Sequence, residues 1–380
     1  MSRSRYLPKA PSAQRNKLWG NMSNGTRYYS LDVLKIVATV FIVFHHYQQV
    51  TGAWFPGLVN FWGGRLYFGY VVELFFILSG FFMFRYIKRI ESGLSFKVFF
   101  TKRVIRLLPL VFVTGLAYEL FLCVYKWYFG SDWMGIQVTL WGLFIDSLGI
   151  QAGWVFENPL VNNPTWYISI LVLCYVVFYL TTYIAQRLKI SPFYLYIAVI
   201  LVGCAVVTYK INAPFLNEMA GRGYYSFFFG ILLAKVINDF PITKKSALLS
   251  ACVVVFLTVV MVVKFDWALS GINFLLTFIY YPCLIAFFMW HPVAKIFDIS
   301  WLGTLGKITY DVYLWHNPNF MLMYIIPALM NWSPNLMSVK AMIFYTVLNF
   351  AIGALSYRLI EKPMNQMVER KVKPLLESNR

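Results

Sequence analysis

Residues 31–50 read LDVLKIVATVFIVFHHYQQV, and this stretch decides the fold. It is about 20 residues long, the length that an α-helix needs to cross a hydrocarbon core about 30 Å thick. It also holds Asp32, Lys35 and two adjacent histidines. Ionisable groups are costly at membrane depth and usually face a bundle interior or a water-filled cavity. The stretch therefore predicts a membrane-spanning helix whose polar side chains serve a function.

The polar side chains of this stretch fall on one face of the expected helix. Successive residues turn by about 100° and rise by 1.5 Å, so Asp32, Lys35, Thr39 and His46 form a stripe with His46 about 16 Å from Lys35. His45 points about 100° away, nearer the apolar side. We therefore expect His46 to carry any chemistry. Two structural interpretations compete: a packed imidazole can simply donate to a carbonyl, and Lys35 can snorkel to the surface.

The composition is that of a polytopic membrane protein. Of the 380 residues, 60% are hydrophobic and 13% are charged, and the mean hydropathy is +0.64, whereas soluble domains carry about 25% charged residues. We expect an all-α transmembrane helix bundle with about ten spanning helices, because about ten apolar segments are long enough to cross. They cover residues 31–50, 66–86, 108–127, 164–184, 192–209, 222–237, 246–263, 271–289, 308–329 and 340–358. Residues 138–150 are too short to span comfortably and contain Asp146, which predicts a short re-entrant or interfacial segment.

Topology accounts for the net charge of +18. With both termini in the cytoplasm, most of the basic residues fall on the cytoplasmic side, as the positive-inside rule requires. The outer loops then contain only Arg65, Lys126, Lys210, Arg222, Lys264 and Lys340. The basic charge therefore indicates membrane lipids, and no nucleic acid, as partners. We expect a multi-pass protein of the cell membrane.

One transmembrane domain accounts for most of the chain. We expect it to cover residues 31–360, between a basic cytoplasmic tail over 1–30 and a second cytoplasmic tail over 361–380. The first apolar segment is too long and too polar to be a cleaved signal. Five cysteines lie in or beside apolar segments without a CxxC pair. We therefore expect neither a disulfide framework nor a metal site.

The second apolar segment holds a single acid, Glu73. Gly69 and Gly80 share its helix face, so a neighbouring helix or a substrate can approach closely there. A carboxylate at this depth needs a partner, and Lys35 or a protonated histidine is the expected one. A purely structural ion pair is an equally good interpretation.

The most basic segment is LSFKVFFTKRVIRLLP, residues 94–109. Arg103 and Arg106 are one helical turn apart and project together. Two guanidinium groups at this spacing can bind phosphate oxygens bidentately. Anionic lipid headgroups are the alternative partner of a basic segment beside the membrane. Pro109 is expected to mark the entry to the next span.

The later part of the chain contains two further polar motifs. LGKITYDVYLWHNP covers residues 305–318 and places Lys307, Asp311 and His316 in or beside an apolar span. SYRLIEKP covers residues 356–363 and is expected to end the last span at the cytoplasmic face.

Together these stretches resemble the acyltransferase-3 family of integral membrane O-acyltransferases. Lys35-x10-His46 is similar to the family's Arg-x10-His motif, and ELFFILSGF from Glu73 is similar to a motif with aspartate before LFF. Arg103-x2-Arg106-Leu-x-Pro109 is similar to the arginine-rich loop, and residues 305–318 and 356–363 are similar to two C-terminal signatures. The chain departs from the family at Lys35, where arginine is usual, and at Glu73, where aspartate is usual.

The resemblance implies transfer of an acyl group, commonly acetyl from acetyl-CoA, to a hydroxyl of an extracytoplasmic polysaccharide or glycolipid. His46 would remove the hydroxyl proton or accept the acyl group itself. Glu73 would orient the histidine, and His316 would be either a second acid/base or a structural donor. Lys35, Arg103 and Arg106 would bind the phosphates of the donor, and no metal is implied.

A proton-coupled secondary transporter or glycolipid flippase is the alternative function. In that case the stripe on the first helix and Glu73 would form a proton relay. The absence of an internal repeat and the paired arginines argue against a carrier.

Overall fold

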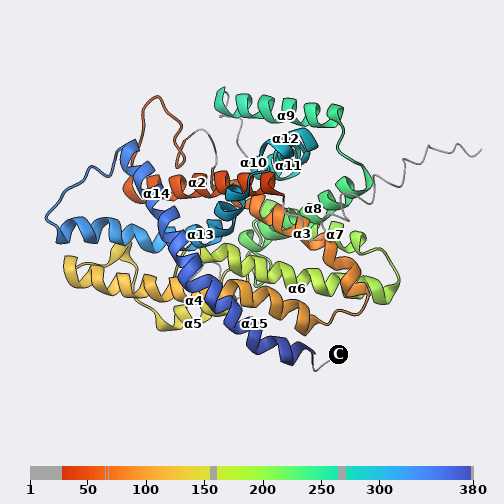
Figure 1. Cartoon of the computed structure of the whole chain (residues 1–380), viewed down its shortest axis with the longest axis horizontal. Coiled ribbons are helices and arrows are strands. Elements are labelled where there is room, and N and C mark those ends of the chain that lie inside the picture. The colour runs from red at the N-terminus through yellow and green to blue at the C-terminus, as the bar shows by residue number, and fades with distance from the viewer. Residues whose placement is uncertain (1–27, 65, 67, 155–160, 264–270, 378–380) are drawn as a thin grey trace, which may run out of the picture.

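The computed structural model describes residues 28–64, 66, 68–154, 161–263 and 271–377. Regular structure in these residues is helical (Figure 1), apart from isolated bridge residues such as the pair Ala213 and Leu216. This confirms the all-α prediction. Most of the predicted basic tail over residues 1–30 lies outside the described residues.

Along the described chain the helices run from α2 to α15, with the short helices η1, η2, η4 and η5 between them. The longer ones are α2 (Tyr29–Thr51), α3 (Val72–Glu91), α4 (Phe96–Phe129), α6 (Thr165–Leu188), α7 (Pro192–Thr208), α8 (Glu218–Asp239), α9 (Lys244–Val263), α13 (Ser300–Leu329), α14 (Val339–Ser356) and α15 (Lys362–Glu377). The shorter ones are η1 (Phe68–Val71), η2 (Trp133–Gly135), α5 (Leu140–Leu148), α10 (Ile272–Leu275), η4 (Leu276–Tyr280), α11 (Tyr281–Met289), α12 (His291–Ile296) and η5 (Tyr357–Glu361).

Seven helical segments in the described part of the chain are long and apolar enough to cross a membrane. They are Tyr29–Thr51, Phe68–Glu91, Phe96–Phe129, Thr165–Leu188, Lys244–Val263, Ile272–Met289 and Val339–Arg370. The remaining predicted spans coincide with the shorter apolar helix α7 and with the more polar helices α8 and α13. The chain is therefore a multi-pass membrane protein. The count of about ten spans and the cytoplasmic termini stay predictions.

The arginine-rich segment is part of a long helix, as the one-turn spacing of Arg103 and Arg106 indicated. α4 runs from Phe96 to Phe129 without a break, and Pro109 lies inside it. Ser95 begins the helix, because its hydroxyl oxygen accepts the backbone N–H of Val98 at 3.4 Å. The helix thus starts well before the apolar segment expected at residues 108–127. The two arginines are carried by the same rigid element as that apolar segment.

The weaker apolar stretch at residues 138–150 forms α5, a helix of 9 residues. This length is too short to span a hydrocarbon core. α5 packs against α4, and the buried carboxylate of Asp146 accepts the N–H of Val161 at 3.0 Å. Asp146 thereby ties α5 to the segment that leads into α6.

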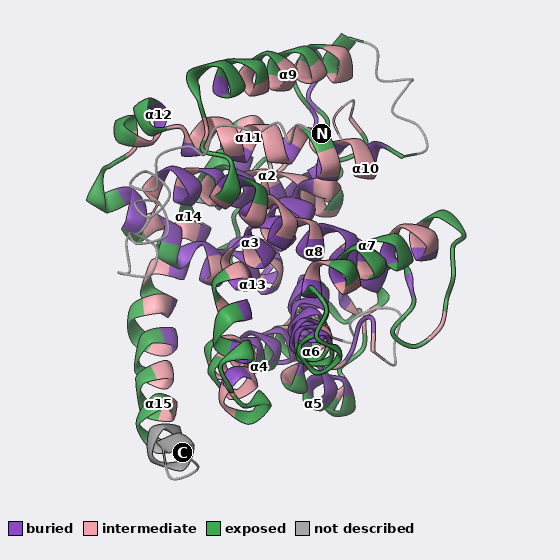
Figure 2. Ribbon diagram, turned by 90° about the vertical axis from the view of Figure 1, so that its right-hand side faces the viewer, coloured by how far each residue is buried: buried purple, intermediate pink, exposed green. Residues whose placement is uncertain are grey.

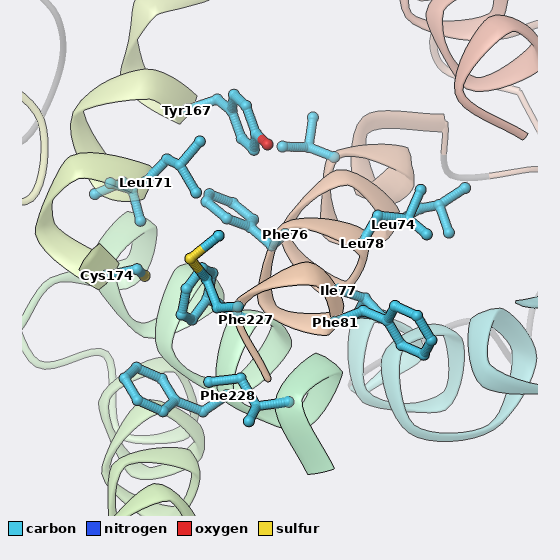
Figure 3. Packing of buried hydrophobic residues seen from close by; sticks show 14 of the residues in the cluster. Leu74, Phe76, Ile77, Leu78, Phe81, Tyr167, Leu171, Cys174, Phe227 and Phe228 are labelled. Atoms are coloured by element: carbon cyan, nitrogen blue, oxygen red, sulfur yellow. The ribbon is translucent and has the colours of Figure 1, made fainter. Parts of the chain in front are cut away.

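The centre of the bundle is the contact between α3 and α8, with α6 beside them. A Cβ atom at Gly80 of α3 would overlap the carbonyl oxygen of Phe227, and one at Gly230 of α8 would overlap that of Ile77. The glycine face predicted on the second span thus serves a close helix contact. Figure 3 shows Phe76 of α3 among side chains of α6 and α8.

The helices that carry the candidate site surround this core. In Figure 1, α2, α13, α4 and α6 run roughly side by side, and α13 packs against both α2 and α4. α9 lies at the periphery and is mostly exposed in Figure 2, as apolar side chains that face lipid are expected to be. α15 continues the chain beyond the last predicted span, where the sequence indicated only a tail.

Candidate active site

Three histidines lie close together where α2 meets α13. The ring centroids of His46 and His316 are 5.2 Å apart, and those of His45 and His46 are 5.1 Å apart. His316 is fully buried, whereas His46 is half-buried. The polar stripe of α2 therefore ends against a second imidazole, which comes from the other end of the chain.

Hydrogen bonds assign the protons of the two facing imidazoles. Nδ1 of His316 lies 2.6 Å from the carbonyl oxygen of Tyr313, and because a carbonyl only accepts, Nδ1 carries the hydrogen. Nδ1 of His46 donates in the same way to Oε1 of Gln49 at 2.9 Å. Nε2 of His316 is buried and has no hydrogen-bond partner among the described residues. Each neutral imidazole thus has its lone pair on Nε2, as a base or a nucleophile requires.

Pro318 explains how neighbouring segments hold the backbone around His316. Proline has no N–H, so it leaves the carbonyl four residues earlier without its helical donor. That carbonyl belongs to Leu314 and accepts Nδ2–H of Asn162 at 3.0 Å. The hydroxyl of Tyr345 donates to the carbonyl of His316. The imidazole is therefore positioned by the segment before α6 and by α14.

His45 is bonded to the loop that follows α2. Its Nδ1 donates to the carbonyl oxygen of Phe61 at 2.8 Å, and its ring packs edge-on against Trp62 at 4.9 Å between centroids. Buried Gln48 accepts the N–H of Phe61 at 2.5 Å. His45 thus helps to fix this loop, on the side of α2 that the helical period predicted.

A cavity of about 580 Å³ lies at the other end of the stripe. α2, α3, α4, α6 and α13 contribute to its wall. Its lining cations are Lys35, Arg85, Arg103, Arg106 and Lys307, and its lining acids are Asp32 and Glu361. The three residues predicted to bind phosphate therefore share one cavity. Its excess of positive charge suits an anionic ligand.

Two of these cations are oriented by their neighbours. Nζ of Lys35 lies 3.1 Å from Oδ1 of Asp32 and 5.3 Å from the ring centroid of Phe82. The guanidinium of Arg103 stacks over the ring of Tyr86 at 4.1 Å, and its Nε is buried without a hydrogen-bond partner among the described residues. Stacking fixes the plane of the guanidinium and leaves its N–H edge able to bind an anion.

Glu73 does not pair with Lys35 or with a histidine, which corrects the partner expected from the sequence. Its carboxylate is completely buried and accepts from Arg222, with Nε to Oε1 at 2.7 Å and Nη2 to Oε2 at 3.1 Å. Nη2 also donates to the carbonyl of Gly69 at 3.0 Å. A bidentate hydrogen-bonded pair between an arginine and a carboxylate is one of the strongest ion-pair geometries. The role of Glu73 in orienting an imidazole stays a prediction.

Aromatic side chains complete the surroundings of this ion pair. The guanidinium of Arg222 lies 5.0 Å from the ring of Tyr70 and 4.9 Å from that of Trp166. The hydroxyl of Tyr225 donates to Oε1 of Glu73 at 3.3 Å. Arg222 is therefore a half-buried member of α8, although the sequence analysis assigned it to an outer loop.

Comparison with known proteins gives one match. The family model of the acyltransferase domain matches residues 28–358, nearly the whole chain. This chain belongs to the acyltransferase-3 family. No curated protein and no solved structure gives a significant match. The membership, together with the apolar helices, makes the protein a membrane acyltransferase.

The two C-terminal signatures of the acyltransferase meet in the structure. Ser356 donates to Oδ1 of Asp311 at 2.7 Å, and Nε1 of Trp315 donates to Ser356 at 2.8 Å. Both residues of α13 are thus bonded to the end of α14. Glu361, from the same signature as Ser356, reaches the wall of the cationic cavity.

Three residues of the site were missed as ligands by the sequence analysis. Arg85 counted only toward the charge on one side of the membrane, and Lys307 was noted only as part of the polar motif at residues 305–318, yet both line the cavity. Arg222 follows a polar stretch at the start of α8, which lowers the local hydropathy. The available signal was the start of the helix: Asn217 is a typical helix-capping residue, and Arg222 lies in the first turns after Glu218.

Proposed function

We propose that this acyltransferase moves an acyl group, commonly acetyl, from cytoplasmic acyl-CoA to a hydroxyl of an extracytoplasmic polysaccharide or glycolipid. The observation that carries the proposal is the cationic cavity at one end of the α2 stripe, with paired imidazoles at the other. In acyl-CoA, a long flexible arm joins the phosphates to the thioester that carries the acyl group. The phosphates match the cavity, and the arm matches the separation of about 16 Å along α2.

Lys35, Arg103 and Arg106 bind the donor phosphates in this proposal. Lys35 is held by Asp32 and contributes a compact charge, whereas the arginines can bind phosphate through paired N–H groups. Arg85 and Lys307 line the same cavity and add to its positive potential. The acidic residues that line the cavity reduce its net positive charge, so that coenzyme A can leave after the transfer.

His46 performs the acyl chemistry through Nε2. As a base, it takes the proton of the acceptor hydroxyl while that oxygen bonds to the thioester carbon and the carbon–sulfur bond breaks. The proton then passes to the thiolate of coenzyme A. As a nucleophile, Nε2 of His46 bonds to the thioester carbon while the carbon–sulfur bond breaks and the thiolate leaves. The hydroxyl oxygen then bonds to that carbon, the bond to Nε2 breaks, and the hydroxyl proton passes to the thiolate. Both routes place His316 within reach to share the proton or to orient the ring.

Labelled acetyl-CoA tests the proposed function. Inside-out membrane vesicles with and without the protein are supplied with acetyl-CoA that carries a radiolabelled acetyl group. We expect label in surface glycan or glycolipid only when the protein is present. Movement of the glycolipid without transfer of label would instead support the transporter or flippase.

Replacing Arg103 and Arg106 together by alanine is expected to raise the KM for acyl-CoA. Hydrogen bonds to charged groups contribute about 1.5–3 kcal/mol each, so the increase is about tenfold or more. The KM for the acceptor is expected to stay the same. Initial rates at varied donor and acceptor concentrations measure both constants.

Arg187→Ala is the matched control for the arginine pair. Arg187 is bonded to Tyr183 at 2.7 Å and lies outside the lining of the cationic cavity. We expect unchanged constants for both substrates in this variant. An increased acceptor KM with an unchanged donor KM in the double variant would refute the assignment.

A further inference from the structure

Three aromatic rings separate the cationic cavity from the paired imidazoles. Phe75, Tyr167 and Tyr313 all line the cavity, whereas no histidine does among the described residues. Their ring centroids lie 5.7 Å apart for the two tyrosines, and 6.2 and 6.4 Å apart for the contacts of Phe75 with Tyr167 and Tyr313. We call these three rings the aromatic wall.

His316 contacts the aromatic wall at Tyr313. Its ring centroid is 5.9 Å from that of Tyr313, and its Nδ1 donates to the carbonyl of the same residue. His46 is in turn a neighbour of His316, with ring centroids 5.2 Å apart. The reacting end of a donor held in the cavity must therefore reach the imidazoles past these rings.

Hydrogen bonds hold two of the three rings. The hydroxyl of Tyr313 donates to the carbonyl of Pro164 at 2.9 Å, and the hydroxyls of Tyr167 and Ser79 share a hydrogen bond at 3.1 Å. Tyr167 also packs against Phe76 at 4.6 Å between centroids, and Figure 3 shows the two rings together. Phe75 has no polar atom in its side chain and is only half-buried. It is the member of the wall that can turn aside at the lowest cost.

We propose that the aromatic wall selects short acyl groups, with Phe75 as the specificity-determining residue. This rests on the proposed function. When the ring of Phe75 turns aside, the space that opens is bounded by the two hydrogen-bonded tyrosines. Close-packed interiors resist added volume. An acetyl thioester fits into that space, whereas each further methylene must displace a hydrogen-bonded ring. One methylene more or less in such a space changes kcat/KM by about 10–200-fold.

Phe75→Ala tests the proposal with two labelled donors. Acetyl-CoA and butyryl-CoA are compared in the same membranes, and kcat/KM is measured for each. The wild type is expected to prefer acetyl-CoA by about tenfold or more. Phe75→Ala is expected to lower this preference by at least about tenfold. Phe75→Leu keeps most of the packing, so it gives a smaller change in the same direction if the alanine variant fails to fold.

Phe82→Ala is the matched control. Phe82 lies on the same helix and lines the same cavity, but its ring faces Lys35. We expect its ratio of acetyl to butyryl transfer to equal that of the wild type, whatever its absolute rate. An unchanged ratio in folded Phe75→Ala or Phe75→Leu would overturn the proposal, as would a wild type that uses both donors equally. Failure of the wild type to transfer either label would instead overturn the proposed function.

Discussion

His46→Ala is expected to abolish acyl transfer while the amount of folded protein stays normal. The loss should be about 10²–10⁴-fold, which is the contribution of a positioned acid–base group. The reason is geometric: Nε2 of His46 carries a lone pair, and its ring faces His316 at 5.2 Å. Transfer of label from acetyl-CoA, normalised to protein detected by immunoblot, measures the effect.

His45→Ala is the internal control for this prediction. It removes an imidazole one residue away, whose Nδ1 is bonded to the carbonyl of Phe61. We expect most of the wild-type rate, with a small loss of stability because one hydrogen bond disappears. Equal losses in the two variants, or activity that survives His46→Ala, would contradict the assignment of the chemistry to His46.

The arrangement along α2 was predictable because it depends on one helical period. The spacing of Asp32, Lys35, Thr39 and His46 already defines a stripe, and local contacts follow from it. Lys35 bonds Asp32 at 3.1 Å, and the hydroxyl of Thr39 donates to the carbonyl of Lys35 at 2.8 Å. The same period indicated that Arg103 and Arg106 project together, and both line the cavity.

Contacts between distant helices were not predictable in this way. Arg222 and Glu73 are 149 residues apart, and their pairing depends on how closely α3 and α8 pack. A single sequence contains the two charges but not the crossing that joins them. Hydropathy likewise located the apolar part of α4 but not its start, because Ser95 begins the helix with a hydrogen bond rather than with apolar residues.

Removing one charge of the Glu73–Arg222 pair is expected to destabilise the fold strongly. Glu73→Gln leaves a guanidinium that is always protonated beside a fully buried side chain and without its counter-charge, at a cost of about 3–5 kcal/mol in the free energy of unfolding. Replacing both residues, with Glu73→Gln and Arg222→Met, leaves no unpaired charge and is expected to recover at least half of that loss. Unfolding of the purified variants in detergent measures the two costs.

Asp239→Asn supplies the control for charge removal at an exposed pair. Lys235 and Asp239 are 2.6 Å apart, but both side chains are exposed, at 42% and 39%. Its cost should stay below about 1 kcal/mol. A cost for Glu73→Gln as small as that of Asp239→Asn would contradict the buried pair.

The activity of the double variant separates structure from chemistry at Glu73. Both carboxylate oxygens of Glu73 accept from Arg222, and no hydrogen bond joins them to an imidazole among the described residues. If the carboxylate serves only to neutralise Arg222, the folded double variant keeps its acyl transfer. If the carboxylate orients an imidazole through the network of α3 and α8, stability returns without activity. We expect the folded double variant to keep its acyl transfer. Both carboxylate oxygens of Glu73 already accept hydrogen bonds from Arg222, so they are not directed at an imidazole.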